Sequence, residues 1–298
     1  MLNWIYFILT AQFIWSVTSV IDKIVISKGY IKNPLVYIAV TSLTDVLLVV
    51  LLPFTGFAPL DFADFLTALL FGIFFGASVV VYYKAVQYEE ISKIIIFAQL
   101  GPVLVFAGSY FFLGEHLSGN NLIGFLLFII AGCILSYNGE EKSFKFGRAF
   151  FLMMVSMILS SFAILFEKHV FNITGFWSAF LWLRLASFAS LSVLFLPSVR
   201  KEFFQNFKTI GYKAKKLIGF KMVIDFTALM LAGYAISKAP VSMVTALGNS
   251  VMPLFVFLIA VLISIYRPNI LKEDISKKAV IAKMLAIFFV LAGIWIMN

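Results

Sequence analysis

Two side chains of opposite charge stand inside long apolar stretches of the sequence. Asp45 belongs to the stretch 34–53, and Arg184 belongs to the stretch 176–196. An ionisable side chain near the centre of a bilayer costs a few kcal/mol at least, so it is either functional or neutralised by a partner. Two interpretations stay open. Either the two charges face a central cavity, where they bind a charged or zwitterionic solute or Asp45 takes up a proton, or they form an ion pair that holds two halves of the protein together.

Two side-chain amides each stand one helical turn before a proline. Gln99 precedes Pro102, and Asn249 precedes Pro253, within apolar sequence that predicts helices. A proline inside a helix kinks it, removes a backbone donor and frees a carbonyl one turn earlier. Each amide is therefore placed either to bind a polar solute beside the freed carbonyl or to satisfy the kink itself.

Further charged and aromatic residues are candidates for the same cavity. Asp225 has Lys221 one turn before it, a spacing that favours a local ion pair, with solute binding as the alternative. Lys84 stands near the end of its stretch, where we expect it to extend toward the membrane interface rather than into a cavity. Three aromatic side chains are candidates for the cavity wall: Trp15, Tyr83 and Tyr234.

Two polar segments between the apolar stretches have a functional and a simpler interpretation. Glu115 and His116 follow the stretch 91–113 and are interpreted as solvated at a helix end, with a gate or a proton relay as the alternative. Phe203, Phe204 and Phe207 recur at helical spacing beside Lys and Arg. That pattern predicts a short helix on an anionic membrane surface, with a partner-binding site as the alternative.

The chain offers few groups for enzyme chemistry. It holds two His and one Cys, and it has no HExxH, P-loop or GxSxG pattern. Cys133 stands inside an apolar stretch and forms no intrachain disulfide. We therefore expect no catalysis, no cofactor and no metal. Gly72 and Gly76 form a GxxxG pattern, which predicts close helix contact within the fold or in a homodimer.

Composition and hydropathy identify the elements that must position these residues. Hydrophobic residues make up 62% of the 298 residues and charged residues 12%, against roughly 25% charged in an average soluble domain. A bilayer core takes about 20 apolar residues to cross as a helix. Such stretches stand at 2–22, 34–53, 64–87, 91–113, 119–138, 147–169, 176–196, 217–237, 241–265 and 277–297. They predict an all-α integral membrane protein with about ten spans.

The basic residues predict how these spans are oriented. The odd-numbered connections and adjoining helix ends hold 20 of the 23 Lys and Arg residues. Basic residues near the ends of membrane helices mark cytoplasmic loops. This bias places the odd-numbered loops in the cytoplasm and both termini outside the cytoplasmic membrane. It also accounts for the net charge of +9 without a nucleic-acid partner.

The two halves of the chain carry matching landmarks, which predict an internal repeat. An acid followed by Lys occurs at Asp22–Lys23 and again at Glu167–Lys168. Tyr83 precedes Pro102 by the same 19 residues that separate Tyr234 from Pro253, and an Ala-Gly pair stands at 131–132 and at 292–293. An odd number of helices per unit makes the second unit enter from the opposite side. The predicted domains are a five-helix unit at 1–138, a linker at 139–147 and a second unit at 148–298.

The landmarks of the first half resemble those of a transporter family. Their order is Trp15–Ser16, Lys23, Pro102, Gly114–Glu115, and a glycine-rich fifth stretch with Gly124 and Gly132. The pattern resembles the EamA family of the drug/metabolite transporter superfamily, whose members carry two five-helix units. The second half keeps the passage KAPVSMVTALGNSVMPLFVF but has Ile265–Tyr266 in place of Gly-Glu. Family members often have cytoplasmic termini, whereas the charges of this chain predict the reverse.

The resemblance implies a secondary transporter of small metabolites such as amino acids, an exporter or an exchanger that works by alternating access. Its expected partners are a small solute, protons as a coupling ion, and the lipid bilayer, with the protein a monomer or a homodimer. A membrane-embedded enzyme and a non-transporting membrane scaffold are the alternative functions.

Overall fold

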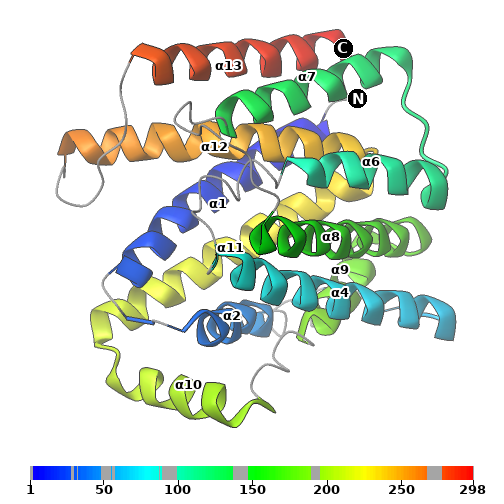
Figure 1. Cartoon of the computed structure of the whole chain (residues 1–298). Helices are drawn as coiled ribbons and strands as arrows, with labels where there is room; N and C mark the ends of the chain where they lie inside the picture. The colour runs from blue at the N-terminus through cyan, green and yellow to red at the C-terminus, as the bar shows by residue number, and fades with distance from the viewer. Residues whose placement is uncertain are drawn as a thin grey trace.

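The chain is all-helical across the residues that the computed structural model describes (Figure 1). Those residues are 3–27, 30–31, 33–47, 55, 58–86, 88, 99–136, 147–188, 195–266 and 277–297. The first half holds α1 (Asn3–Ser27), α2 (Pro34–Ser42), the 3-10 helix η1 (Leu43–Leu47), α4 (Phe62–Val86), α6 (Leu100–Leu113) and α7 (Gly119–Ser136). The second half holds α8 (Arg148–Ile173), α9 (Phe176–Ser187), α10 (Pro197–Thr209), α11 (Tyr212–Lys238), α12 (Val241–Tyr266) and α13 (Lys277–Met297).

The lengths and compositions of these helices are those of a multi-pass membrane protein. Within the described residues, five helical segments are long and apolar enough to cross a bilayer: Asn3–Asp22, Phe62–Tyr82, Arg148–Ile173, Tyr212–Lys238 and Val241–Leu262. Shorter apolar helices occupy Leu35–Asp45, Leu100–Leu113, Gly119–Leu135 and Ile281–Met297. Each of the ten predicted stretches overlaps a described helix, and the second stretch overlaps both α2 and η1. The predicted linker lies outside the described residues except for Gly147.

Local sequence signals set the helix ends. The Asn33 side chain accepts a hydrogen bond of 3.0 Å from the Leu35 amide, and Pro34 fills the first position of α2, where its missing N–H costs nothing. Gly114 ends α6 in the left-handed conformation, at φ 65°, and its amide binds the Ser109 carbonyl. The family-like Gly-Glu pair is therefore a helix stop followed by a carboxylate.

The second predicted stretch is not one continuous α-helix. The α-helix ends at Ser42, and η1 follows with Asp45 in it. The hydroxyls of Thr41 and Ser42 both donate to the Ile38 carbonyl, at 3.0 and 2.9 Å. Such bonds compete with the helix backbone for the same acceptor, and a 3-10 segment inside a membrane element is typical of a hinge. This break sets the position from which Asp45 extends.

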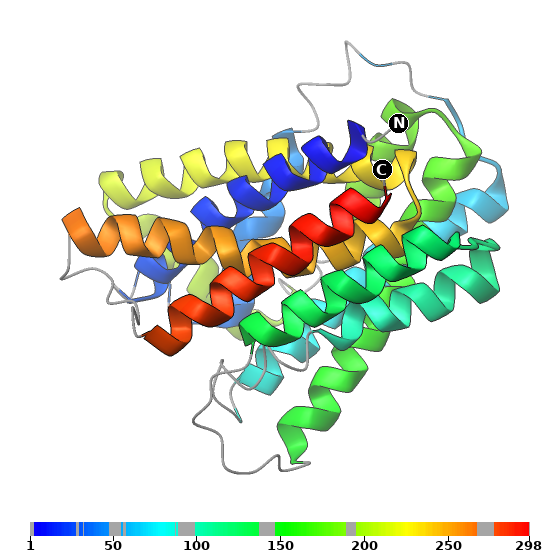
Figure 2. The ribbon, with the colours of Figure 1, turned by 90° about the horizontal axis from the view of Figure 1, so that it is seen from above.

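The helices of the two halves pack across each other rather than in separate bundles. The first helix of the first half, α1, packs against α11 and α12, whereas the first helix of the second half, α8, packs against α4 and α6. The last helices of the halves, α7 and α13, lie side by side at one edge (Figures 1 and 2). The start of α1 and the end of α13 lie at the same end of the molecule (Figure 2).

The core lies where these helices cross. Its fully buried large side chains come from both halves and include Phe128, Phe180, Leu183, Met243 and Leu247. Many apolar side chains on the outer faces are exposed, among them Phe111 at 77%, Phe288 at 64% and Trp295 at 78%. Exposed apolar surface of this extent is expected of helices that face lipid rather than water.

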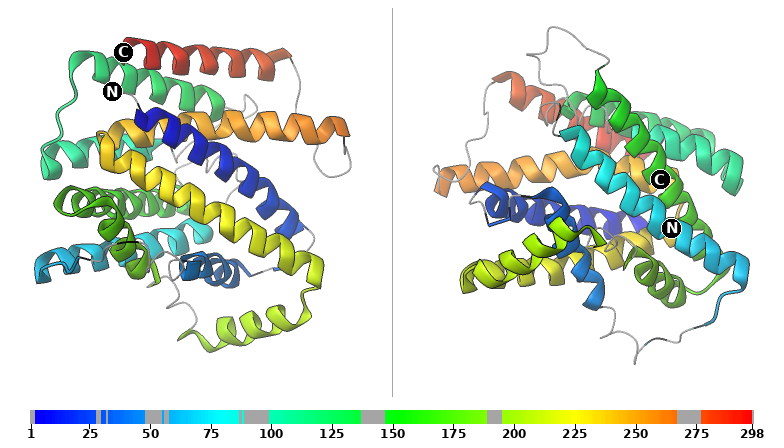
Figure 3. Two further views of the ribbon diagram at one scale, coloured as in Figure 1. Left: turned by 180° about the vertical axis from the view of Figure 1, so that it is seen from behind. Right: turned by 60° about the horizontal axis from the view of Figure 1, so that its bottom comes forward.

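The predicted basic, Phe-rich helix is present as α10, which lies at the edge opposite α7 and α13 (Figure 3). Val199 and Phe203 are buried against α2, while Phe204 and Phe207 are 56% and 48% exposed. The two exposed rings beside lysines retain the character of an interfacial helix. Attachment of α10 to a membrane surface stays a prediction.

The predicted GxxxG contact lies inside the fold. A Cβ at Gly72 of α4 would overlap the backbone carbonyl of Ala186 on α9, because the two helices approach closely there. Close approach of this kind is the usual role of a small residue in a membrane helix. Gly72 thus sets the distance between α4 and the helix that carries Arg184.

We expect Gly72→Val to destabilise the protein by about 3 kcal/mol, because a backbone carbonyl cannot move aside as a side chain can. Thermal unfolding of the purified protein in detergent measures this. The control is Gly119→Val, since nothing lies within 4 Å of a Cβ at Gly119. Equal unfolding temperatures for the two variants would contradict the close approach.

Candidate functional site

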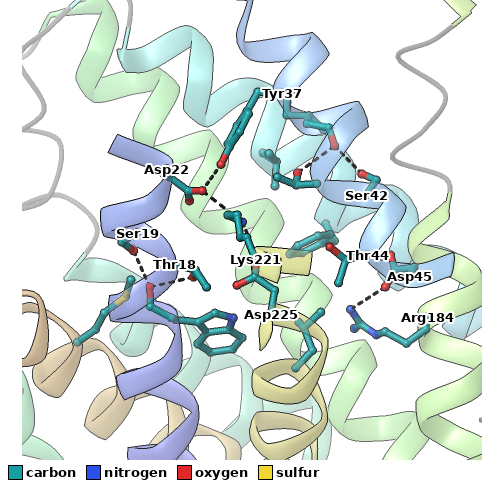
Figure 4. A pocket seen from close by; sticks show the side chains of 17 residues that line it. Thr18, Ser19, Asp22, Tyr37, Ser42, Thr44, Asp45, Arg184, Lys221 and Asp225 are labelled. Carbon is teal, nitrogen blue, oxygen red and sulfur yellow. Dashed lines mark hydrogen bonds and ion pairs between the residues drawn. The ribbon is translucent and has the colours of Figure 1, made fainter. Parts of the chain in front are cut away.

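A polar cavity of about 300 Å³ lies among helices of both halves (Figure 4). Its walls come from α1, α2, η1 and α4 of the first half and from α9, α11 and α12 of the second. That volume is at the lower end of the range for small-molecule sites, about 300–1,000 Å³. Five charged side chains line it: Asp22, Asp45, Arg184, Lys221 and Asp225.

Asp45 and Arg184 meet at one side of this cavity. Arg184 Nη1 lies 3.7 Å from Asp45 Oδ1, and both side chains are nearly fully buried. The Ser187 hydroxyl donates to Asp45 Oδ2, and the guanidinium lies 5.4 Å from the ring of Phe71 and 5.7 Å from that of Phe180. The two interpretations from the sequence are therefore not exclusive, because the ion pair is present and both of its members line the cavity.

This ion pair still has free hydrogen-bonding capacity. Among the described residues, Asp45 Oδ1 and Arg184 Nε are buried without a hydrogen-bond partner. Glu167 on α8 also interacts electrostatically with Arg184. A buried polar group without a partner costs about 1–3 kcal/mol, so a solute that supplied the missing bonds would gain affinity.

Lys221 joins α1, α2 and α11 at the other side of the cavity. Its ammonium pairs with Asp225, one turn later on α11, and lies 3.3 Å from Asp22 Oδ1 on α1. The Tyr37 hydroxyl of α2 donates to the same Asp22 oxygen, and the Tyr37 ring centroid lies 6.0 Å from Lys221 Nζ. The local pair predicted for Asp225 is present, but it belongs to a larger cluster.

Hydroxyl groups fill much of the wall between these two charged sites. Thr18 and Ser19 of α1 donate to the Trp15 carbonyl, as Thr41 and Ser42 of α2 do to Ile38. The hydroxyl oxygens of Thr18, Ser19 and Thr41 can each accept a hydrogen bond as well as donate one. Trp15, one of the three aromatic candidates for the cavity wall, lines the cavity.

Several other candidates from the sequence lie away from this cavity. Asn249 and Lys84 are exposed, and Gln99 is buried against Gly132 of α7. Tyr234 packs instead against Phe7 and Phe176, with ring centroids 4.5 and 5.3 Å apart. The side chain of Tyr83 lies outside the described residues.

The two prolines differ in their positions. Pro253 stands inside α12, where the carbonyl of the preceding Met252 accepts a bond of 3.2 Å from the Ser16 hydroxyl of α1. Pro102 stands in the first turn of α6, where a proline leaves no helical hydrogen bond unmade. The hydroxyl of Ser16, rather than the amide of Asn249, therefore meets the chain beside Pro253.

Glu115 forms a second charged cluster, so the interpretation of this residue as solvated is wrong. Its side chain is 13% exposed, accepts a bond of 2.9 Å from the Val241 amide and lies 3.7 Å from Lys168 Nζ. Lys168 donates to the carbonyls of Ile236 and Ala239, both at 2.8 Å. This clamp, defined by Glu115, Lys168 and residues 236–241, joins the α6–α7 turn to α8 and to the α11–α12 turn.

His116 takes no part in the clamp. It is exposed, and its ring lies against Tyr110 in an edge-on arrangement with centroids 4.9 Å apart.

Sequence reasoning missed Asp22 and Tyr37 as site residues, and it favoured a solvated role for Glu115 over a gate or a proton relay. Each stands near the end of an apolar stretch, where a polar residue is usually solvated. The repeated acid-Lys pair was the one signal that pointed to Asp22, because it marked the same place in both halves.

Comparisons with known proteins bear on the family of the first half and on the fold. A model of the EamA-like transporter family matches residues 2–138. A solved structure titled "Crystal structure of protein" has a TM-score of 0.69 and 16% sequence identity, and the match covers 99% of this chain and 96% of that chain. At that identity the likeness shows a shared fold alone. No curated protein matches the sequence.

We expect Arg184→Gln to destabilise the protein by about 3–5 kcal/mol, because it leaves the buried Asp45 without a cation. Asp45→Asn should cost less, since Arg184 keeps its interaction with Glu167. Unfolding of both variants in detergent compares the two costs. An Asp45→Asn variant that is as unstable as Arg184→Gln would contradict this assignment.

The Glu115 clamp should depend on pH. Burial raises the pKa of the Glu115 carboxyl above its ordinary value of 4.5, and this outweighs the opposing effects of Lys168 and the Val241 amide. A carboxyl with a raised pKa in the closed clamp holds its proton more tightly there than in water. The protonated carboxyl therefore stabilises the closed clamp fully below about pH 4.5. This stabilisation is lost as pH rises through the raised pKa.

Amide hydrogen exchange at the start of α12, corrected for the intrinsic effect of pH, measures this closure. Protection should fall with rising pH in the wild type and stay flat in Glu115→Gln, with His116→Gln as the control that behaves as the wild type. The same pH profile in Glu115→Gln and wild type would contradict the role of this carboxyl.

Proposed function

We propose that this chain, whose first half belongs to the EamA-like transporter family, is a secondary transporter that moves small metabolites across the cytoplasmic membrane by alternating access. The observation that carries the proposal is the polar, charge-lined cavity between the halves. Charged side chains in membrane helices are costly and usually mark a solute or ion pathway. Export or exchange of amino acids or related metabolites, with protons as a coupling ion, is the form of transport that we propose.

The architecture that we propose is ten spans in two inverted five-helix units, at 1–138 and 148–298, joined by the linker 139–147. The crossed packing supports it, because α1 contacts α11 and α12 just as α8 contacts α4 and α6. Units related by inversion would make such reciprocal contacts, with the solute site between them. The basic residues support odd-numbered loops in the cytoplasm and both termini outside.

Alternating access needs a closure on each side of the cavity, and the structure offers two charged clusters for that role. Asp22 belongs to the acid-Lys pair near the end of α1, and Lys168 belongs to the matching pair, Glu167–Lys168, near the end of α8. In the proposed orientation the cluster of Asp22, Lys221 and Asp225 lies toward the cytoplasm, and the Glu115 clamp lies toward the outside. Opening one cluster while the other stays paired would move the site from one face to the other.

Counterflow in proteoliposomes tests the proposal. Vesicles are loaded in turn with one unlabelled acidic, neutral or basic amino acid or one organic acid, and the labelled solute is then added outside. We expect concentrative exchange of at least one solute class, reduced at least tenfold by Asp45→Asn and unchanged by Lys84→Met, whose side chain is exposed.

Two results would contradict the proposal. Uncoupled bulk conductance would indicate a channel, and the absence of exchange for every solute would favour a membrane-embedded enzyme or a non-transporting scaffold. If Asp45→Asn lowers stability but leaves exchange unchanged, the protein is still a transporter. The Asp45–Arg184 pair then has a structural role only.

A further inference from the structure

The charges that line the cavity do not balance. Three carboxylates, those of Asp22, Asp45 and Asp225, face two cations, Arg184 and Lys221, among the described lining residues. Arg184 is committed to Asp45 and is held between two aromatic rings. Lys221 is thus the only cation beside the remaining two carboxylates in the described part of the cavity, which favours the presence of a further positive charge.

The two carboxylates around Lys221 are arranged as a site for an ammonium group. Asp22 approaches from α1 and Asp225 from α11, so they hold the Lys221 ammonium from two helices (Figure 4). Tyr37 of α2 fixes Asp22 by donating a hydrogen bond to it. The Asp225 side chain is 12% exposed, and its Oδ1 has no hydrogen-bond partner among the described residues. An acceptor therefore remains for a donor from the cavity.

Lys221 differs from Arg184 in what its side chain can do. Lysine carries a compact ammonium on a flexible four-carbon stem, whereas the guanidinium of arginine is planar and rigid. Since Lys221 lines the cavity, its ammonium can leave the two carboxylates without leaving the protein. A solute with its own ammonium group presents the same charge and the same donors to Asp22 and Asp225.

We propose that Asp22 and Asp225 form a binding site for the ammonium group of a transported solute, and that Lys221 occupies this site whenever no solute is bound. This proposal rests on the proposed function and names the class of its cargo, which is a small solute with a primary amine. The lysine keeps the empty carrier electrically paired, so the empty carrier can change conformation without exposing two bare carboxylates to a low-dielectric environment. Cargo binding then exchanges one ammonium for another.

The first test replaces the lysine by a free amine and needs no knowledge of the cargo. In Lys221→Ala the vacated site should take up n-propylammonium, which has the length of the deleted group. The unfolding temperature of purified Lys221→Ala should rise saturably with n-propylammonium chloride, at a half-saturating concentration at least tenfold below that of the wild type. Equal concentrations of sodium chloride and sodium propionate control for ionic strength and for an anion site.

Matched variants make the result specific. Lys238→Ala, at an exposed lysine of the same helix, should respond as the wild type does. Adding Asp225→Asn to Lys221→Ala should abolish the response to the amine. Because Lys221→Ala can fail to fold, Lys221→Ser, which also vacates the site but keeps a small polar side chain, is tested in parallel and should show the same gain. No gain with n-propylammonium in either lysine variant, or an equal gain with sodium propionate, would overturn the proposal.

The second test uses transport and separates this proposal from the proposed function. Labelled L-lysine, putrescine and succinate serve as probes in counterflow with the wild type, Asp22→Asn, Asp225→Asn and Lys221→Met. We expect exchange of an amine probe that both aspartate variants lose. In Lys221→Met, the ratio of net uptake into vesicles without internal solute to exchange should fall at least tenfold relative to the wild type.

Exchange of succinate alone would support transport and overturn the amine site. The wild type can instead exchange none of the three probes while n-propylammonium still stabilises Lys221→Ala. That result would support the amine site and count against the proposed function.

Discussion

The fold of this protein depends on how it pairs charges inside a membrane. Asp45 and Arg184 neutralise each other across the two halves, and Lys221 does the same for Asp22 and Asp225 across α1 and α11. Each ion carries a desolvation cost of several kcal/mol that only a close partner offsets. The helices that carry these residues must therefore approach one another in one arrangement. Packing of α1 against α11, and of η1 against α9 and α11, supplies that arrangement.

The same constraint explains where the protein can change shape. The Asp45–Arg184 and Asp22–Lys221 pairs each join a helix of one half to a helix of the other, so relative movement of the halves separates at least one of them. Such movement becomes affordable when a solute or a proton replaces the lost partner. The 3-10 segment that carries Asp45 and the proline inside α12 are places where helical hydrogen bonding is already incomplete. We infer that the charged clusters hold each conformation closed and that these two segments bend when the protein changes conformation.

The sequence predicted the helices well, because apolar runs of membrane length leave few other structures. It also predicted the local pair of Lys221 with Asp225, since that contact depends on helical spacing alone. It did not predict that Asp22 completes this cluster, because the contact joins residues about 200 positions apart in two helices. For Asn249 the sequence suggested a role that the structure does not support. Its spacing to Pro253 suggested solute binding, but Asn249 lies on an exposed face of α12. The solvated role expected for Glu115 was wrong because a helix end next to a loop is usually exposed to water. Here the α11–α12 turn covers the carboxylate.

Alternating access of the cavity is the central claim, and accessibility of one cavity residue tests it most directly. Ser19 lines the cavity and is half-buried, so a single cysteine is placed there by Ser19→Cys in a Cys133→Ser background. Sealed vesicles of known orientation are treated with a membrane-impermeant thiol reagent from one side at a time. We expect modification from both sides, and a transported solute should shift the ratio of the two modification rates. Modification from one side alone, unchanged by every solute that the protein exchanges, would contradict alternating access.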